Sequence, residues 1–314
     1  MGALALLGLL GVVVSIPFFE DDDGPVARDD DTAEGAPDED LPPAEPDTEV
    51  DGAVLAFDGT EAVTGTEGDD TLIAGISSED LLPMITTVDL AGGDDVATIT
   101  GGESFDIRGG VGDDSIVIEG FGVNHSIHGD DGNDTLVAGE GNFLLGGAGD
   151  DVLTINLSTT IFDSFTQSDA GAGDDTITVT SFVGDAVPDF SSVGVTGGEG
   201  NDAFTAELTV IEDQFNGPDS TATSIRSFSG VVFNGFDTEE DTLVIEIDRA
   251  EGQQDRILAS TDLLPLSSEG DYQVQLTFSA TNDDPEMTTY ITLRDVEGPL
   301  TIDDIDIVDL VTAA

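Results

Sequence analysis

The chain of 314 residues contains no cysteine, no tryptophan and no lysine. Without cysteine it forms no disulfide, no thiolate metal site and no cysteine nucleophile. Six arginines stand against 68 aspartates and glutamates, which gives a formal net charge of -62 at pH 7. A charge of this sign and size repels DNA, RNA and anionic lipid surfaces, so no nucleic-acid partner is expected.

The sequence also lacks two motifs that are typical of hydrolases. It contains no H-E-x-x-H of a zinc protease and no G-x-S-x-G of a lipase. His125 and His128 lie three residues apart in an extended segment, a spacing that places them on opposite faces of a strand and argues against a shared metal ion. We expect both histidines to be solvated and structural, and we expect no enzymatic activity.

The acidic composition needs a physical explanation, because self-repulsion of this size opposes a compact state. Hydrophobic residues make up 38% of the chain, which is enough for a real core. Bound cations would neutralise the charge, whereas a surface adapted to high salt would tolerate it. Composition alone leaves both explanations open.

The N-terminal region divides into two segments. Residues 1–19 are hydrophobic, and residues 2–19 carry no charge. As a helix they would extend about 27 Å, close to the thickness of a bilayer core. The sequence leaves four interpretations of this segment open: an uncleaved membrane anchor, a leader, a cleaved signal peptide or a buried part of the domain. Residues 20–62 are acidic and rich in proline, which predicts a disordered linker.

A repeated Gly-Asp pattern occupies the next part of the chain. Its seven copies are residues 65–72, 90–97, 109–116, 129–136, 146–153, 170–177 and 197–204. The second acidic residues of successive copies are 25, 19, 20, 17, 24 and 27 residues apart. Apolar residues at alternate positions follow each copy, and a second glycine-containing turn and short strand complete the repeat. Each repeat therefore predicts two strands and two turns, which form one coil of a solenoid.

Such a loop has the chemistry of a site for a hard cation. Calcium takes six to eight oxygen ligands from carboxylates and backbone carbonyls. Glycines let the backbone turn with positive φ and direct its carbonyls inward, and the aspartate places a carboxylate at the start of the strand. In stacked coils, an ion between two loops would be ligated by both.

The pattern resembles the RTX, or hemolysin-type calcium-binding, repeat G-G-x-G-x-D-x-U-x, in which U is a large apolar residue. Residues 109–117, 146–154 and 197–205 match it at every specified position. The resemblance implies calcium-driven folding and carboxylate ligation by the second acidic residue of each copy, namely Asp70, Asp95, Asp114, Asp134, Asp151, Asp175 and Asp202. It also implies carbonyl ligands near Gly109, Gly110, Gly112, Gly146, Gly147 and Gly149. The second half of each coil lacks the aspartate, so we expect ions along one edge only, most securely from Asp95 to Asp175.

These observations predict an all-β protein whose calcium-binding parallel β-roll, a β-solenoid, spans residues 63–210. We expect residues 211–314 to form a capping and secretion region, in which residues 272–278 and 289–293 form an antiparallel hairpin. Residues 300–314 resemble the uncleaved export signals of type I secreted RTX proteins. A location outside the cell or at its surface, with a structural or adhesive role, follows as an expectation.

An alternative function is recognition of a surface. Threonines alternate at residues 98–100 and 176–180, and on a solenoid they would form a flat face of hydroxyl and methyl groups, as in ice-binding or adhesive β-solenoids. The competing explanation is that threonine is a good strand residue on a solvated face. No protein or surface partner can be named from the sequence.

Overall fold

The computed structural model describes residues 52–76, 85–120, 124–139, 141–157, 165–184, 192–211, 224–226, 230–280 and 286–310. The chain divides into two units, Met1–Asp47 and Thr48–Ala314, and all described residues belong to the second. The hydrophobic segment at residues 2–19 and most of the expected linker lie outside these ranges, as do the last four residues. No helix within the described ranges is long and apolar enough to cross a membrane.

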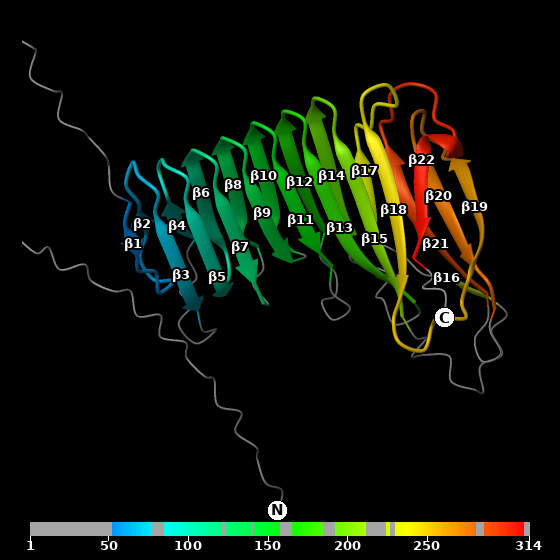
Figure 1. Cartoon of the computed structure of the whole chain (residues 1–314), viewed down its shortest axis with the longest axis horizontal. Helices are drawn as coiled ribbons and strands as arrows, with labels where there is room; N and C mark the ends of the chain where they lie inside the picture. Colours follow the sequence, from blue (N-terminus) through cyan, green and yellow to red (C-terminus); the bar gives the residue numbers. More distant parts are fainter. Residues whose placement is uncertain are drawn as a thin grey trace, which may run out of the picture. The chain divides into compact units, whose positions relative to one another are not determined.

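The described chain forms two sheets, which it enters alternately from β1 to β15 (Figure 1). Sheet A contains, in order, β1 (Val54–Leu55), β3 (Thr71–Ile76), β5 (Val96–Gly101), β7 (Ser115–Glu119), β9 (Thr135–Gly139), β11 (Val152–Asn156), β13 (Thr176–Val183), β15 (Ala203–Val210), β18 (Thr242–Arg249) and β22 (Ile305–Asp309). Sheet B contains, in order, β2 (Val63–Thr64), β4 (Thr86–Asp89), β6 (Phe105–Val111), β8 (Ser126–Asp131), β10 (Phe143–Ala148), β12 (Phe165–Ala172), β14 (Ser192–Glu199), β17 (Val231–Asn234), β21 (Glu286–Arg294), β20 (Tyr272–Phe278) and β19 (Leu258–Pro265). The short β16 (Ser224–Arg226) pairs with β21, and one 3-10 turn, η1 (Ile302–Asp304), precedes β22.

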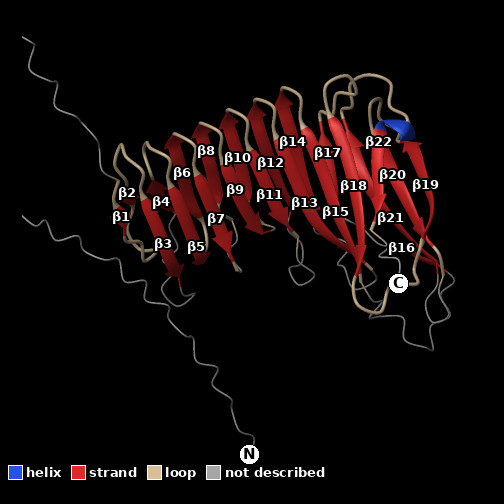
Figure 2. Ribbon diagram, viewed as in Figure 1, coloured by secondary structure: helices blue, strands red, loops and turns tan. Residues whose placement is uncertain are grey.

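Neighbouring strands of sheet A pair in parallel throughout, and those of sheet B do so from β2 to β21. Each strand therefore lies one coil away from its partner in the same sheet, as Figure 2 shows. The predicted parallel β-roll is confirmed.

The two edges of the roll differ in the length of their connections. From β6 to β15, each crossing from sheet B to sheet A spans three residues, such as 112–114 between β6 and β7. The crossings from sheet A to sheet B vary, from residues 140–142 between β9 and β10 to residues 184–191 between β13 and β14. The unequal spacing of the repeats therefore arises from the second edge and from strands of five to eight residues, and not from the first edge. The Gly-Asp turns lie at the first edge, where the geometry is constant.

The core lies between the sheets and follows the two-residue period of the strands. In sheet A, Ile116, Leu136, Leu153 and Ile177 are fully buried and occupy the same register in successive coils. Residues on either side of them face outward. The pattern matches the alternation that predicted these strands.

The C-terminal region contains the predicted hairpin, because β20 and β21 pair antiparallel, and β19 adds a further antiparallel strand. The parallel roll nevertheless extends beyond the expected boundaries. β1 begins at Val54, before residue 63, while β17, β18 and β22 continue the two sheets past residue 210. Thr242–Arg249 keeps the alternation of inward apolar residues although the preceding loop has lost most of its glycines, so the strand still stacks.

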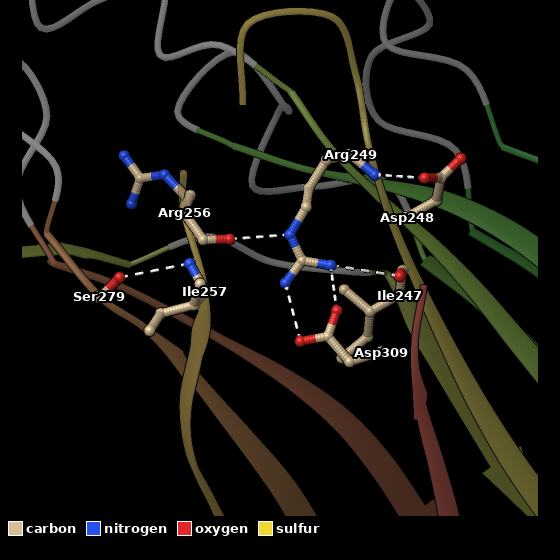
Figure 3. A network of polar contacts seen from close by, with 7 residues as sticks. All are labelled: Ile247, Asp248, Arg249, Arg256, Ile257, Ser279 and Asp309. Carbon is tan, nitrogen blue, oxygen red and sulfur yellow. Dashed lines mark hydrogen bonds and ion pairs between the residues drawn. The ribbon is translucent and has the colours of Figure 1, made fainter. Parts of the chain in front are cut away.

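A buried arginine fixes the end of sheet A (Figure 3). The Arg249 side chain is 3% exposed, and its guanidinium forms a two-pronged ion pair with Asp309 of β22. Its Nε also donates a 2.8 Å hydrogen bond to the backbone oxygen of Arg256. The contact joins β18 to the last strand and to the segment that leads into β19.

We predict that Arg249→Met destabilises the C-terminal end of the roll by about 3 kcal/mol, because Asp309 would be left partly buried without its partner. The matched control is Arg294→Met, at an exposed position of β21, for which about 0.5 kcal/mol or less is expected. Urea unfolding followed by circular dichroism measures both. Equal effects of the two substitutions would contradict the proposed importance of the buried pair.

Candidate metal-binding edge

The seven aspartates predicted as ligands form one row along the first edge of the roll, here called the inner row. Each lies directly before a strand of sheet A, at the end of a Gly-Asp turn. All seven are at most 2% exposed. Aspartate is rarely buried to this extent without a cationic partner, and the described part of the chain provides no arginine in contact with the row.

Backbone hydrogen bonds connect the row from coil to coil. The N–H of each inner-row residue donates to Oδ1 of the aspartate in the following coil, over distances of 2.6–3.0 Å. The chain of bonds runs from Asp70 to Asp202 and then reaches Asp241, before β18. One oxygen of each carboxylate is therefore used to hold the stacking register.

The second carboxylate oxygen is left without a partner in the middle of the row. Oδ2 is buried and accepts no hydrogen bond at Asp95, Asp114, Asp134, Asp151 and Asp175. A buried polar atom without a partner costs about 1–3 kcal/mol, and a charged one costs more. In five successive coils, one buried carboxylate oxygen therefore lacks the cation or proton that would compensate its charge.

Protein donors satisfy both oxygens of Asp70, at one end of the row, and of Asp241, which follows Asp202 in the next coil. Asp70 accepts hydrogen bonds from the backbone of Ala53 and from Thr66. At the other end, Asp241 accepts from the backbone N–H of Asp202 at 2.9 Å and of Asp237 at 2.8 Å. Asp241 was not among the site residues predicted from the sequence. The signal that identifies it is the aspartate directly before an alternating strand.

The glycines place backbone oxygens against these carboxylates. A Cβ at Gly109 would overlap with Oδ2 of Asp114 and lie 2.8 Å from the carbonyl oxygen of Gly129 in the next coil. Gly146 has the same relation to Asp151 and to the carbonyl of Ala170. The absence of a side chain at the first glycine thus leaves a cradle between one carboxylate and the carbonyl of the following coil.

The remaining predicted glycines stack closely on the preceding coil. Gly112 has φ +134°, and Gly149 has φ +133°; a Cβ at either would overlap with the carbonyl oxygen of Gly93 or Gly132. Gly110 and Gly147 have φ +117° and +126° and make the same kind of approach. Positive φ and close contact with a backbone oxygen together require glycine here.

A second row of polar side chains follows the solvent side of the same turns, here called the outer row. It consists of Asp69, Asp94, Asp113, Asn133, Asp150, Asp174 and Asn201, all exposed. From Asp94 onward, the backbone N–H of each outer-row residue donates to Oδ1 of the outer-row residue in the preceding coil, over 2.7–3.0 Å. These hydrogen bonds therefore point toward the preceding coil, whereas those of the inner row point toward the following coil. This role was not predicted from the sequence, although every copy has Asp or Asn at that position.

Burial alters the pKa of the inner-row carboxyls. It raises the pKa of Asp114 and Asp175 to about 7, and that of Asp95, Asp134 and Asp151 to about 6. Burial also favours a higher pKa for Asp70, but the hydrogen bonds from Thr66 and Ala53 outweigh this effect, so the pKa of Asp70 is lowered. The carboxyls without a partner for Oδ2 thus resist ionisation until a cation compensates their charge.

The donor set fits a hard cation that accepts backbone ligands. The described residues contain no point at which three or more Asp, Glu or His side chains converge. The inner row instead offers one carboxylate per coil, with carbonyl oxygens of adjacent turns beside it. An all-oxygen set of this kind suits calcium and offers no nitrogen or sulfur for a soft metal.

The histidines lie away from the inner row. His125 is fully buried, which corrects the expectation that it is solvated. Its Nδ1 accepts a 3.1 Å hydrogen bond from the backbone N–H of Phe105, and its ring packs on the Phe105 ring with centroids 4.9 Å apart. His128 faces outward beside Asp106, with 3.4 Å between Nε2 and Oδ1. The two side chains lie on opposite faces of the strand, as predicted.

Comparisons with known proteins add no family to this description. No protein-family model matches the chain, and no curated protein is similar to it in sequence.

The raised pKa values predict an unusual dependence of stability on pH for the metal-free protein. The five carboxyls bind protons more tightly when folded than when unfolded, where the pKa of Asp is about 3.9. Their contribution is therefore fully present below about pH 4 and is lost as the pH rises to about 7. Far-UV circular dichroism in chelator at pH 4.5 and pH 7.5 measures the effect, and a stronger β signal at pH 7.5 than at pH 4.5 would contradict it.

Proposed function

We propose that the chain is a calcium-binding protein of the RTX type, in which ions bind along the inner row and drive folding. The observation that carries the proposal is the set of five buried carboxylate oxygens without partners, from Asp95 to Asp175. Each lies beside backbone oxygens of adjacent turns. One divalent cation at each position would satisfy the oxygen, neutralise buried charge and connect two coils.

The location and role of the protein follow from the same proposal. RTX-type proteins fold where calcium is abundant, so we propose a secreted or surface-attached bacterial protein with a structural, non-enzymatic role. Extracellular calcium modules commonly bind at roughly 10⁻⁴ to 10⁻³ M. A site that is saturated at about one hundred times its dissociation constant adds about 2.7 kcal/mol to stability. Several such sites would decide whether the roll is folded.

The alternative explanation of the acidic composition, adaptation to high salt, concerns a different part of the molecule. Carboxylates that serve hydration need to be exposed, and the outer row and much of the remaining surface supply them. The inner row is buried and has no contact with solvent that could screen it. Salt adaptation therefore leaves the five unpaired oxygens unexplained, whereas bound calcium accounts for them.

Calcium titration of the full chain tests the proposal. At pH 7.5 we expect the β signal in far-UV circular dichroism to be weak in excess chelator and to rise cooperatively as calcium increases through roughly 10⁻⁴ to 10⁻³ M. Magnesium at the same concentration should be a poor substitute, because it requires a stricter geometry with fewer ligands. An unchanged spectrum between chelator and saturating calcium would refute calcium-driven folding.

A pair of neighbouring substitutions tests the position of the ions. Asp114→Asn keeps an acceptor for the N–H of Asp95 but removes the charge beside the cradle. We expect the variant to lose one bound ion and about 2.7 kcal/mol of calcium-dependent stabilisation. In chelator at pH 7.5 it should keep more β signal than the parent protein, because a buried charge without a partner has been removed.

The matched control is Asp113→Asn, one residue earlier in the outer row. Asn already occupies this row at residues 133 and 201, and its Oδ1 can still accept the hydrogen bond from Asn133. The control should keep the calcium response and stoichiometry of the parent. Isothermal titration calorimetry and urea unfolding compare the two variants, and an equal loss in both would place the ions away from the inner row.

A further inference from the structure

The outward face of sheet A carries two long ranks of uncharged side chains. The first rank contains Thr71, Val96, Ser115, Thr135, Val152, Thr176, Ala203 and Thr242, which pair in register across eight strands. The second rank, two residues further along each strand, contains Ile73, Thr98, Val117, Val137, Thr154, Thr178, Thr205 and Val244. Together they form a continuous strip, here called the A face.

The A face is unusual because of the chain in which it occurs. A protein with a net charge of -62 places no charged residue in either rank. Several of its apolar side chains are open to solvent, including Ile73 at 75% and Val96 at 46%. The outward face of sheet B differs, since Asp106, Arg108 and His128 form ion pairs on it. On sheet A, charge returns only beside the two ranks: Glu119, Glu207 and Glu246 lie two residues beyond the second rank, and the outer row lies two residues before the first. The A face is therefore a neutral strip bordered by acidic residues.

The side chains of the A face are also rigid. Every member of the second rank is valine, isoleucine or threonine, whose branching at Cβ restricts χ1. Methyl and hydroxyl groups are thus held in a fixed array on a pleated surface, with little conformational entropy to lose on contact. Such a surface favours a partner that is itself flat, neutral and ordered.

The spacing of the array matches that of ordered water. Neighbouring strands lie about 4.8 Å apart, and alternate residues of one strand lie about 6.7 Å apart. In a tetrahedral water lattice with O–H···O distances of about 2.75 Å, second-neighbour oxygens lie about 4.5 Å apart, and the repeat along the hexagonal axis is about 7.3 Å. Both lattice repeats are within about a tenth of the protein repeats.

Other occupants fit the A face less well. A second copy would bring two sets of acidic turns together, and a strip about 34 Å by 10 Å buries less than half of the roughly 800 Å² per partner that a stable interface needs. A membrane insertion surface would need basic residues together with Trp, Phe or Leu. The two ranks contain none of these residue types.

From these observations we infer that the A face binds the surface of ice crystals. The inference goes beyond calcium binding, on which it depends only in that calcium would keep the roll folded. The hydroxyl groups would take lattice positions in the first water layer, while the methyl groups would fill the spaces between them. Binding would be irreversible on the scale of crystal growth, because many weak contacts form at once across eight strands.

The test measures thermal hysteresis and partition into a growing ice hemisphere, with full-length protein in saturating calcium. We expect the parent protein to separate the freezing point from the melting point and to concentrate in the ice. The double variant Thr154→Tyr and Thr178→Tyr, which places two bulky rings in the middle of the second rank, should lose both activities.

The matched control is Thr196→Tyr, on the outward side of β14 in sheet B, which should behave as the parent does. Circular dichroism on the same samples establishes that each variant is folded. A folded, calcium-loaded parent without hysteresis or ice partition would overturn the inference while leaving calcium binding intact. Equal loss in the control, or a dimer in sedimentation that the double variant abolishes, would overturn it as well.

Discussion

The buried row of carboxylates is the constraint on which the rest of the roll depends. One aspartate per coil occupies the same place, and the backbone N–H of each donates to the carboxylate of the next. This bond uses one carboxylate oxygen to fix the stacking register of the coils. The other oxygen is buried and has no hydrogen-bond partner at the five aspartates from Asp95 to Asp175. The glycines, the raised pKa values and the proposed need for calcium all follow from this one arrangement.

The periodic features of the fold could be predicted from the sequence because they are local. Alternation of apolar residues after Asp114, Asp134 and Asp151 indicated strands with one buried face, and the Gly-Asp turns indicated where each strand begins. Both are decided within about ten residues of chain. The ends of the roll were harder to predict, since Asp241 follows a turn that has lost the glycines although its carboxylate still accepts the bond from Asp202.

The features that could not be predicted depend on contacts between coils 17–27 residues apart. The repeat alone does not reveal that Asp70 has donors for both oxygens whereas Asp114 lacks one, because one donor, Ala53, reaches Asp70 from the preceding coil, although the other, Thr66, lies in the same turn. The burial of His125 likewise depends on the backbone of Phe105, one coil earlier. The A face becomes visible only when the register places Thr98, Val117 and Val137 side by side, since no single repeat contains a regular motif there.

The unequal edges of the roll have a consequence for how such a protein changes over evolution. From β6 to β15, crossings at the Gly-Asp edge keep three residues, while the strands and the crossings at the opposite edge vary in length. A segment inserted there displaces neither row of hydrogen bonds, and a whole coil added or removed leaves every remaining turn beside an equivalent neighbour. Repeat number and loop content are therefore free to diverge independently, so that new surface loops can arise on one side of a scaffold whose other side is unchanged.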